Sequence, residues 1–226
     1  MIDFLGLKAV IWDMDGVVLD SEPVHYLTYQ IILEKYKITS SDERAKQSYG
    51  MTDHQTIQYI TDKVLPDDVV DKIVDEKNVL FKQIITEKAV FLPGVQKWME
   101  LFKQNGIRQA LASSSSQENI DLILEKLGTH IYLDEVVSGA YLPSKPEPFI
   151  FLHAAERLGV SPLTCLVIED AVAGIQAAKA AGMKCIAVST TNPANKLGDA
   201  DLVIGNLAQL MMPQIQSLFQ LAGDIS

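Results

Sequence analysis

The sequence predicts an α/β fold with a mostly parallel sheet and a helical domain inserted after the first strand. Short apolar runs, typical of strands buried on both faces, alternate with stretches of helical periodicity through most of the 226 residues. Several runs end at acidic or hydroxyl side chains, as expected where the carboxyl ends of parallel strands bind ligands. Residues 21–88 show helical periods and no convincing strand, so this block interrupts the alternation.

Composition and charge limit the kinds of partner. Hydrophobic residues make up 48% and charged residues 21% of the chain, as expected of a globular protein with a full core. The net charge of −10 argues against nucleic acid or an anionic membrane as a partner. No apolar run approaches the length of a membrane span. We expect a monomer that acts on a small molecule.

The cysteines and the N-terminal residues indicate the compartment. Cys165 and Cys185 both lie in apolar, strand-like runs, so we expect buried free thiols and a reducing environment. Asp3 and the lack of a basic stretch near the N-terminus argue against a signal peptide. Together these features predict a cytoplasmic location.

Residues 9–12, Ala-Val-Ile-Trp, are the first predicted strand, and Asp13, Asp15 and Gly16 follow at its end. In an extended backbone both carboxylates point to one side and repel each other unless a cation lies between them. Mg²⁺ suits one or two carboxylates plus a substrate phosphate. One aspartate could then be a nucleophile and the other a general acid and base. The alternative is a solvated Asp-Gly turn after a buried strand.

The longer stretch from Asp13 to Pro23, DMDGVVLDSEP, resembles the first motif of the haloacid dehalogenase superfamily of phosphohydrolases. The resemblance is strongest to the branch that holds β-phosphoglucomutase and the sugar-phosphate phosphatases. It implies a doubly wound, Rossmann-like core formed by residues 1–20 and 89–226. Residues 21–88 would form a helical cap that closes over the active site and helps to select the substrate.

Apolar spacing predicts the helices of this cap and the elements of the core. In the cap, helical periods cover residues 26–36, 56–64 and 69–85. After residue 90 the predicted elements are, in order, a helix over 95–105, a strand over 108–112, a helix after Ser116, a strand over 136–138, a helix from Phe149, a strand over 165–168, a helix over 171–178, strands over 185–188 and 202–204, and a closing helix over 207–221.

Four serines, Ser113 to Ser116, separate the second predicted strand from the next helix. A helix start of this kind offers a capping hydroxyl and free backbone N–H groups, which can hold a phosphate. A polar loop with one capping serine is the alternative. The resemblance implies that Ser113 binds the transferring phosphoryl group and that Ser114 adds its backbone N–H.

Lys145 lies in the stretch Pro-Ser-Lys-Pro-Glu-Pro, whose prolines limit the freedom of the backbone. A lysine held in place can neutralise phosphate oxygens and a carboxylate nucleophile. An exposed lysine in an ordinary loop is the alternative. Lys-Pro-x-Pro before an apolar helix matches the third motif of the family, which implies that Lys145 is the catalytic lysine.

Glu169 and Asp170 follow the strand predicted over residues 165–168, in the same arrangement as the first acidic pair. Acids at two strand ends could share one metal ion, although a solvated pair before the next helix is the alternative. The pair matches the fourth motif of the family. The resemblance implies that Asp170 binds the metal directly and that Glu169 binds it directly or through water.

The four motifs together imply a reaction. Mg²⁺ is held by Asp13, the backbone carbonyl of Asp15 and Asp170, with support from Glu169. Asp13 attacks a phosphate monoester and forms an aspartyl-phosphate, and Asp15 protonates the leaving alcohol and later activates water. Ser113 and Lys145 hold the phosphoryl oxygens. We therefore expect a Mg²⁺-dependent phosphatase that hydrolyses a sugar or polyol phosphate.

A phosphosugar mutase of the β-phosphoglucomutase type is the main alternative. In that enzyme an arginine of the first cap loop grips a second phosphate, whereas residues 50–54 of this chain place Asp53 there. An acid repels phosphate, which favours hydrolysis. Lys77 and His25 are candidates for substrate binding from the cap, with a solvated helix face and a polar helix residue as the respective alternatives.

Other reaction classes fit the motifs less well. A haloalkanoate dehalogenase would lack the second aspartate and the acidic pair, and a phosphonate hydrolase would need a Schiff-base lysine in the cap. A binding protein that is not an enzyme would be expected to lose a carboxylate or Lys145, and both kinds of residue are present.

Overall fold

The structure is a computed structural model that describes the chain except residues 1–3, 5, 49–50, 62–63 and 221–226. Within the described residues the strands form one six-stranded sheet with the order β3-β2-β1-β4-β5-β6, and all neighbouring strands are parallel. This arrangement confirms the doubly wound α/β fold. The strands are β1 (Ala9–Trp12), β2 (Arg108–Ser113), β3 (Glu135–Ser138), β4 (Cys165–Glu169), β5 (Lys184–Val188) and β6 (Leu202–Ile204).

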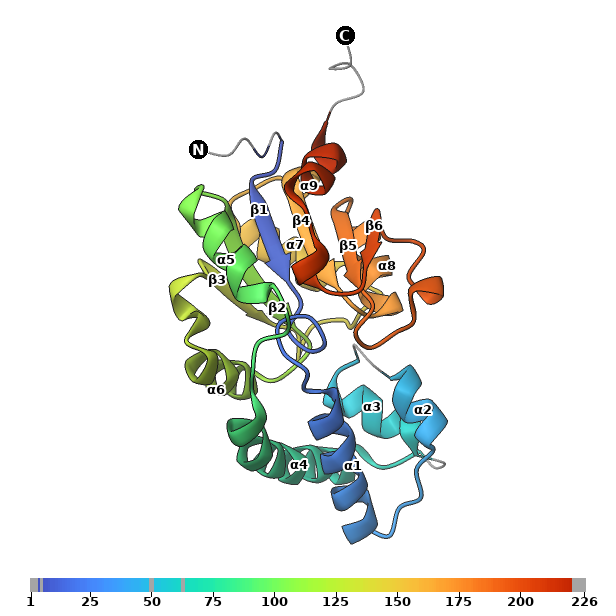
Figure 1. Cartoon of the computed structure of the whole chain (residues 1–226). Helices are drawn as coiled ribbons and strands as arrows, with labels where there is room; N and C mark the ends of the chain where they lie inside the picture. The colour runs from blue at the N-terminus through green and yellow to red at the C-terminus, as the bar shows by residue number, and fades with distance from the viewer. Residues whose placement is uncertain (1–3, 5, 49–50, 62–63, 221–226) are drawn as a thin grey trace.

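Helices cover both faces of the sheet (Figure 1). Alternate residues of β1 separate the two layers, since Val10 and Trp12 pack in one apolar cluster and Ala9 and Ile11 in the other. This is the alternation expected of a strand that is buried on both faces. The first face is covered by α5 (Val95–Gln104), α6 (Gln117–Leu127) and α9 (Met212–Phe219), and the second by α7 (Phe149–Leu158) and α8 (Val172–Ala180).

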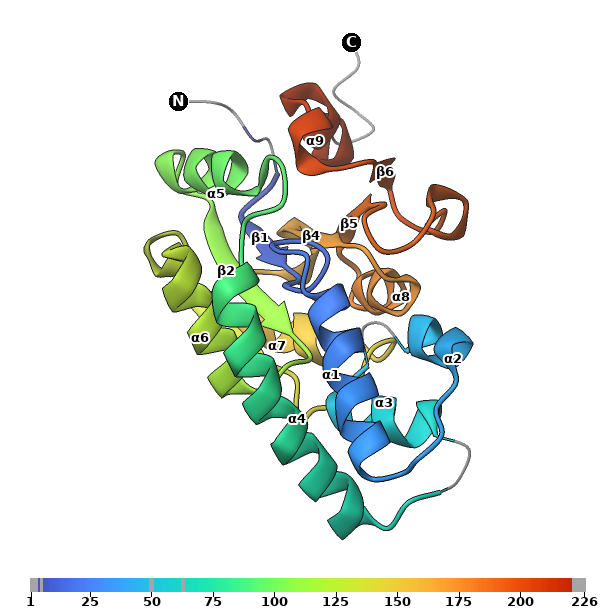
Figure 2. The same cartoon turned by 60° about the horizontal axis from the view of Figure 1, so that its bottom comes forward.

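The helices between β1 and α5 lie together beyond the carboxyl ends of the strands (Figures 1 and 2). They have an apolar cluster of their own, centred on Ile57 and Ile73, and the main cluster continues into them at Phe81. The division into a core of residues 1–20 and 89–226 and a cap of residues 21–88 stays a prediction, which the separate cluster supports. The helices are α1 (Glu22–Lys35), α2 (Asp42–Gln47), α3 (Asp53–Ile60) and α4 (Asp67–Lys88).

Three elements differ from those predicted. The helix predicted over residues 56–64 is α3, which begins earlier, at Asp53 after the N-cap Thr52, and ends at Ile60. Helix α2 has no apolar periodicity to reveal it, and it begins at the N-cap Ser41, whose hydroxyl accepts a hydrogen bond from Arg44 N. The closing helix predicted over 207–221 is a short turn, Leu207–Gln209, followed by α9. Pro213 lies in the first turn of α9, where proline is tolerated, but inside a longer helix it would break the hydrogen-bond ladder. Residues 62–63, 50 and 221 of the predicted segments lie outside the described residues.

Two further expectations can be compared with the structure. Cys165 and Cys185 are free thiols and are buried on the neighbouring strands β4 and β5, as predicted. No helix in the described part of the chain is long and apolar enough to cross a membrane.

The buried side chain of Gln109 connects several elements of the core. Its Oε1 accepts a hydrogen bond from Trp12 Nε1 at 3.0 Å. Its Nε2 donates to the carbonyl oxygens of Met99 at 2.8 Å and Tyr132 at 3.1 Å. Because Gln109 is fully buried, water cannot replace these partners. One amide therefore satisfies polar groups of β1, α5 and the segment before β3.

We expect Gln109→Leu to lower the free energy of unfolding by about 2–4 kcal/mol, because the Trp12 indole N–H loses its acceptor and the carbonyls of Met99 and Tyr132 each lose a donor. Urea denaturation measures the loss. Trp12→Phe removes the same indole hydrogen bond, so the double variant should lose less than the sum of the two single variants. Strictly additive losses would contradict this account.

Candidate active site

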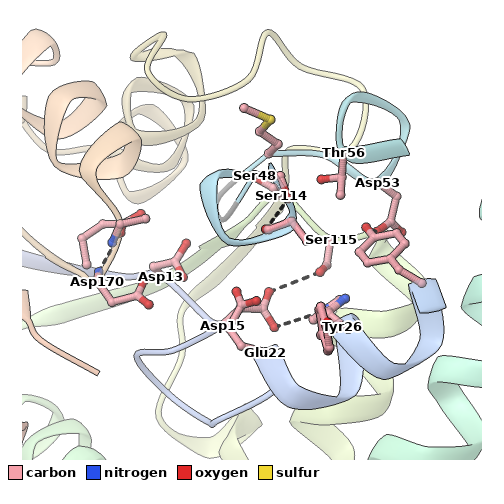
Figure 3. A pocket seen from close by; sticks show the side chains of 16 residues that line it. Asp13, Asp15, Glu22, Tyr26, Ser48, Asp53, Thr56, Ser114, Ser115 and Asp170 are labelled. Carbon is pink, nitrogen blue, oxygen red and sulfur yellow. Dashed lines mark hydrogen bonds and ion pairs between the residues drawn. The ribbon is translucent and has the colours of Figure 1, made fainter. Parts of the chain in front are cut away.

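A cavity lies where the carboxyl ends of β1, β2 and β4 face the cap helices (Figure 3). The backbone N–H of Asp13 donates to the carbonyl of Ile168 at 3.0 Å, which extends the pairing of β1 and β4 to the edge of the cavity. Parallel strands end at the same edge of a sheet, so motifs far apart in the sequence meet here. The cavity is lined from the core by Asp13, Asp15, Ser114, Ser115, Glu169, Asp170 and Ala171.

Lys145 forms a buried ionic contact with two of the predicted acids. Its Nζ donates to Asp13 Oδ1 and, at 2.6 Å, to Glu169 Oε1. The ring of Phe151 lies 5.0 Å from the same nitrogen. Burial would lower the pKa of Lys145, but the carboxylates of Asp13 and Glu169 raise it above its ordinary value. Lys145 is therefore a fixed cation beside the predicted nucleophile, and the alternative of an exposed loop lysine is wrong.

Glu169 uses both carboxylate oxygens within the protein. While Oε1 faces Lys145, Oε2 accepts hydrogen bonds from the backbone N–H groups of Asp170 and Ala171, each at 2.7 Å. These contacts favour a role in positioning Lys145 and the start of α8. The predicted role of Glu169 as a metal ligand stays a prediction.

Asp13 and Asp170 are two buried carboxyl groups that lie close enough for the charge of Asp13 to affect the pKa of Asp170. Burial and the carboxylates of Glu169 and Asp15 outweigh Lys145 and raise the pKa of Asp13 to about 8. Burial, Glu169 and Asp13 raise the pKa of Asp170 well above its ordinary value. Two such groups ionise together only if a cation offsets the repulsion.

The backbone leaves room for these acids at Gly16. This glycine has a φ of 77°, and a Cβ atom there would lie 2.0 Å from Asp170 Oδ2. A side chain at position 16 would thus occupy the space beside the acids. The loop after β5 closes the other side, where Asn192 Nδ2 donates to the carbonyl of Asp170 at 3.1 Å.

The donor set fits Mg²⁺. Asp13 and Asp170 supply hard carboxylate oxygens that line the cavity, and the backbone carbonyl of Asp15 stays the predicted third ligand. Among the described residues no three His, Cys, Asp or Glu side chains gather into a metal cluster. Mg²⁺ does not need one, since it is usually held by one or two carboxylates together with water and substrate phosphate. It would supply positive charge to a bound phosphoryl group.

Asp15 lies at the junction of core and cap. Its Oδ2 is 3.3 Å from the hydroxyl oxygens of both Ser113 and Ser115, which donate to it. Its Oδ1 accepts from the hydroxyl of Ser21 and lies 3.4 Å from His25 Nε2. Burial alone would raise the pKa of Asp15, but His25 and Ser21 more than offset this and lower it. Figure 3 shows Asp15 next to Ser115, with a dashed line for the hydrogen bond between them.

The structure brings the two predicted cap residues together. Lys77 Nζ lies 2.9 Å from His25 Nδ1 and donates to Asp53 Oδ1 at 2.7 Å. The ring of Phe81 stacks on His25 with 4.3 Å between centroids. The Lys77 side chain is 0% exposed, so the alternative of a solvated helix face is wrong. Contacts thus lead from Asp15 through His25 and Lys77 to Asp53.

Several lining residues were missed in the sequence. The hydroxyl of Ser115 donates to Asp15, and the run of four serines gave no reason to single out Ser115. Glu22 and Tyr29 also line the cavity. Glu22 was visible as part of the first motif, whereas Tyr29 fitted an ordinary apolar helix face.

Gly174, in the first turn of α8, is required by the position of Glu169. A Cβ atom at this glycine would lie 1.7 Å from Glu169 Oε1. We expect Gly174→Ala to displace Glu169 and, with it, Lys145, and to lower the kcat for any phosphate ester by at least about tenfold. Steady-state kinetics measures the loss. Gln176→Ala, at an exposed position of the same helix, is the control, and equal activity of both variants would contradict the argument.

Comparison with protein families gives one matching model. Residues 10–188 match the haloacid dehalogenase-like hydrolases. Among curated proteins, a phosphorylated carbohydrates phosphatase of Thermotoga maritima is 31% identical over 185 residues, which cover 80% of this chain and 84% of the relative. A β-phosphoglucomutase of Bacillus subtilis is 32% identical over 214 residues, which cover 91% and 92%.

A solved structure agrees with these relatives. The β-phosphoglucomutase of Clostridium difficile superposes with a TM-score of 0.84 at 27% identity, over 94% of this chain and 97% of that one. The matched region contains all four motifs and both halves of the sheet. The resemblance found in the sequence is thereby confirmed, and the chain is an enzyme of the haloacid dehalogenase-like hydrolase family.

Proposed function

We propose that this enzyme is a Mg²⁺-dependent phosphatase that hydrolyses a sugar or polyol monophosphate through an aspartyl-phosphate. The observation that carries the proposal is the buried contact of Lys145 with Asp13, beside a cavity that also holds Asp15 and Asp170. The phosphatase from Thermotoga maritima and a hexitol phosphatase B of Escherichia coli, 30% identical over 90% of this chain and 94% of the relative, support it.

Each residue then has a defined role. An Asp13 oxygen attacks phosphorus as the ester P–O bond breaks, and Asp15 gives a proton to the departing alkoxide. Asp15 next takes a proton from water, which attacks the phosphorus of the aspartyl-phosphate and releases inorganic phosphate. Lys145, Ser113 and the backbone N–H of Ser114 hold the phosphoryl oxygens during both transfers.

Asp15 must carry a proton for the first transfer. The pKa of its carboxyl is lowered in the protein without substrate, where His25 and Ser21 offset the effect of burial. A phosphate dianion bound next to it would raise this pKa, because like charges disfavour the ionised form. Substrate binding thus prepares Asp15 as an acid.

A phosphosugar mutase is the second candidate, which the β-phosphoglucomutases of Bacillus subtilis and Clostridium difficile favour. A mutase must hold a sugar with a phosphate at each end. At the cap end of the cavity the described lining residues include no Lys or Arg, the nearby Lys77 is already paired with Asp53 at 2.7 Å, and Asp53 stands where the mutase carries an arginine. The phosphatase is therefore the first choice.

The same proposal includes the surroundings of the enzyme. The free thiols of Cys165 and Cys185 suit a reducing compartment such as the cytoplasm. The net charge of −10 favours a small substrate over nucleic acid or an anionic membrane. We propose a monomer, since no long apolar surface pattern stands out in the sequence.

The first test is a phosphate-release screen with Mg²⁺ over sugar, polyol and nucleotide monophosphates. We expect turnover of sugar or polyol phosphates, and a loss of at least about 10³-fold in kcat for Asp13→Asn, which lacks the nucleophile. Asp20→Asn, an exposed acid of the same segment, is the control.

The same assay distinguishes the mutase. β-Glucose 1-phosphate with a trace of glucose bisphosphate is incubated in parallel. Formation of glucose 6-phosphate with little phosphate release would identify a mutase and refute the phosphatase proposal.

The raised pKa of Asp13 predicts how pH affects Mg²⁺ binding. Between the ordinary value of 3.8 and about 8 the folded protein holds a proton that the unfolded chain releases, so without metal its stability falls as pH rises through this range. Mg²⁺ must displace that proton below pH 8. We therefore compare the two pH values at one fixed Mg²⁺ concentration, about a hundred times the Kd at pH 8. At this concentration we expect Mg²⁺ to raise Tm by about 5–10 °C at pH 8 and by less at pH 6, where its Kd is higher.

Thermal melts with and without Mg²⁺ measure this difference. Asp170→Asn should remove most of the Mg²⁺ effect at both pH values. An equal rise in Tm of the unsubstituted enzyme at pH 6 and pH 8 would contradict the argument.

A further inference from the structure

The cavity has a second end, which is formed by the cap. Figure 3 shows Asp53 and Thr56 on the opposite side of the cavity from Asp13 and Asp170. The lining at this end consists largely of hydroxyl groups and one carboxylate, which donate or accept hydrogen bonds and carry no positive charge. These residues are Tyr26, Tyr29, Ser48, Asp53 and Thr56.

Only one of the two oxygens of the Asp53 carboxylate accepts hydrogen bonds from the described residues. Its Oδ1 accepts hydrogen bonds from the hydroxyl of Tyr29 at 2.5 Å and from Lys77 Nζ at 2.7 Å. Among the described residues none donates to Oδ2, although the side chain is only 15% exposed. Because Asp53 lines the cavity, a donor inside the cavity can reach this oxygen, and a hydroxyl group of a bound substrate can be that donor.

The cation at this end of the cavity, Lys77, is already paired with the Asp53 carboxylate. Lys77 is buried beneath Asp53, with the rings of Tyr29 and Phe81 each 4.9 Å from its Nζ. Burial alone would raise the pKa of Asp53, but Lys77 and His25 lower it to about 2. Asp53 is therefore ionised at neutral pH and can only accept hydrogen bonds. The pair as a whole offers no net positive charge to a second anion.

We infer that Asp53 is a specificity residue whose Oδ2 receives a hydroxyl group from the uncharged end of the substrate. The subsite would select polyhydroxylated monophosphates and reject sugars with a second phosphate or a carboxylate. This inference rests on the proposed phosphatase function. It assigns to Lys77 the task of holding Asp53 in place and of cancelling its charge.

Removing the charge of Asp53 should reverse this preference. Asp53→Asn keeps the size of the side chain but leaves the Lys77 ammonium unpaired beside the cavity. A hydroxyl then loses a charged acceptor, while a second phosphate gains a cation. The two kinds of substrate should therefore respond in opposite directions.

The experiment compares kcat/KM for glucose 6-phosphate and glucose 1,6-bisphosphate. We expect Asp53→Asn to lower the value for the monophosphate by about 10-fold to 100-fold, mainly through KM. The ratio of bisphosphate to monophosphate should rise by at least about 10-fold. Asp71→Asn is the matched control, because Asp71 forms an exposed ion pair with His54 at 2.9 Å between the same two helices, α3 and α4. An unchanged ratio in Asp53→Asn would overturn the inference.

A second variant covers the case in which Asp53→Asn does not fold. Tyr29→Phe removes one hydrogen bond that orients the carboxylate and leaves all charges in place. We expect it to raise KM for glucose 6-phosphate about 3-fold to 10-fold more than KM for p-nitrophenyl phosphate, which has no hydroxyl to offer. Equal changes for the two substrates would contradict the subsite.

The aryl phosphate also separates this inference from the proposed function. If p-nitrophenyl phosphate is hydrolysed, Asp13→Asn abolishes the turnover, and the sugar ratio still does not respond to Asp53→Asn, the enzyme is a phosphatase and the subsite is wrong. If the unsubstituted enzyme releases phosphate from no ester, the phosphatase proposal and the subsite are both wrong.

Discussion

The buried contact of Lys145 with Asp13 and Glu169 determines much of the site around it. Charges out of reach of water are tolerated only when every partner is in place, and removal of one partner leaves the others uncompensated. The contact joins the ends of β1 and β4 to the loop before α7. Gly174 is needed because Glu169 occupies the space where a side chain would lie. The ionic contact thus fixes both Asp13, the proposed nucleophile, and the backbone that surrounds it.

The parallel sheet explains why this contact can form, and the cap forms the other end of the cavity beside it. Strands β1, β2 and β4 end at one edge, so the acids, the serines and the lysine meet without long loops. The cap adds a second group of charges. Its His25 lies against Asp15 and its Lys77 against Asp53, so one path of contacts joins Asp15, the proposed proton donor, to the far end of the cavity.

The sequence predicts the core part of the site better than the cap part. In the core, each functional residue directly follows an apolar strand or lies between prolines, so the local pattern is sufficient to locate it. In the cap, Lys77 lies among charged residues and would be taken for a solvated helix face. Its burial depends on Tyr29, which comes from α1, and on Phe81, which lies one turn further along α4. Its pairing with Asp53 depends on how α3 packs against α4, which no local pattern contains.

Charge balance gives the two ends of the cavity different tasks. Six acidic side chains, Asp13, Asp15, Glu22, Asp53, Glu169 and Asp170, line it in a protein of net charge −10. A phosphate can enter only where cations offset this charge, and Lys145 with Mg²⁺ would do so at the core end. At the cap end, Lys77 does no more than cancel Asp53. This charge balance is the reason for the proposed subsite, in which the end of the substrate that lies there is uncharged and donates hydrogen bonds, as a sugar or polyol hydroxyl does.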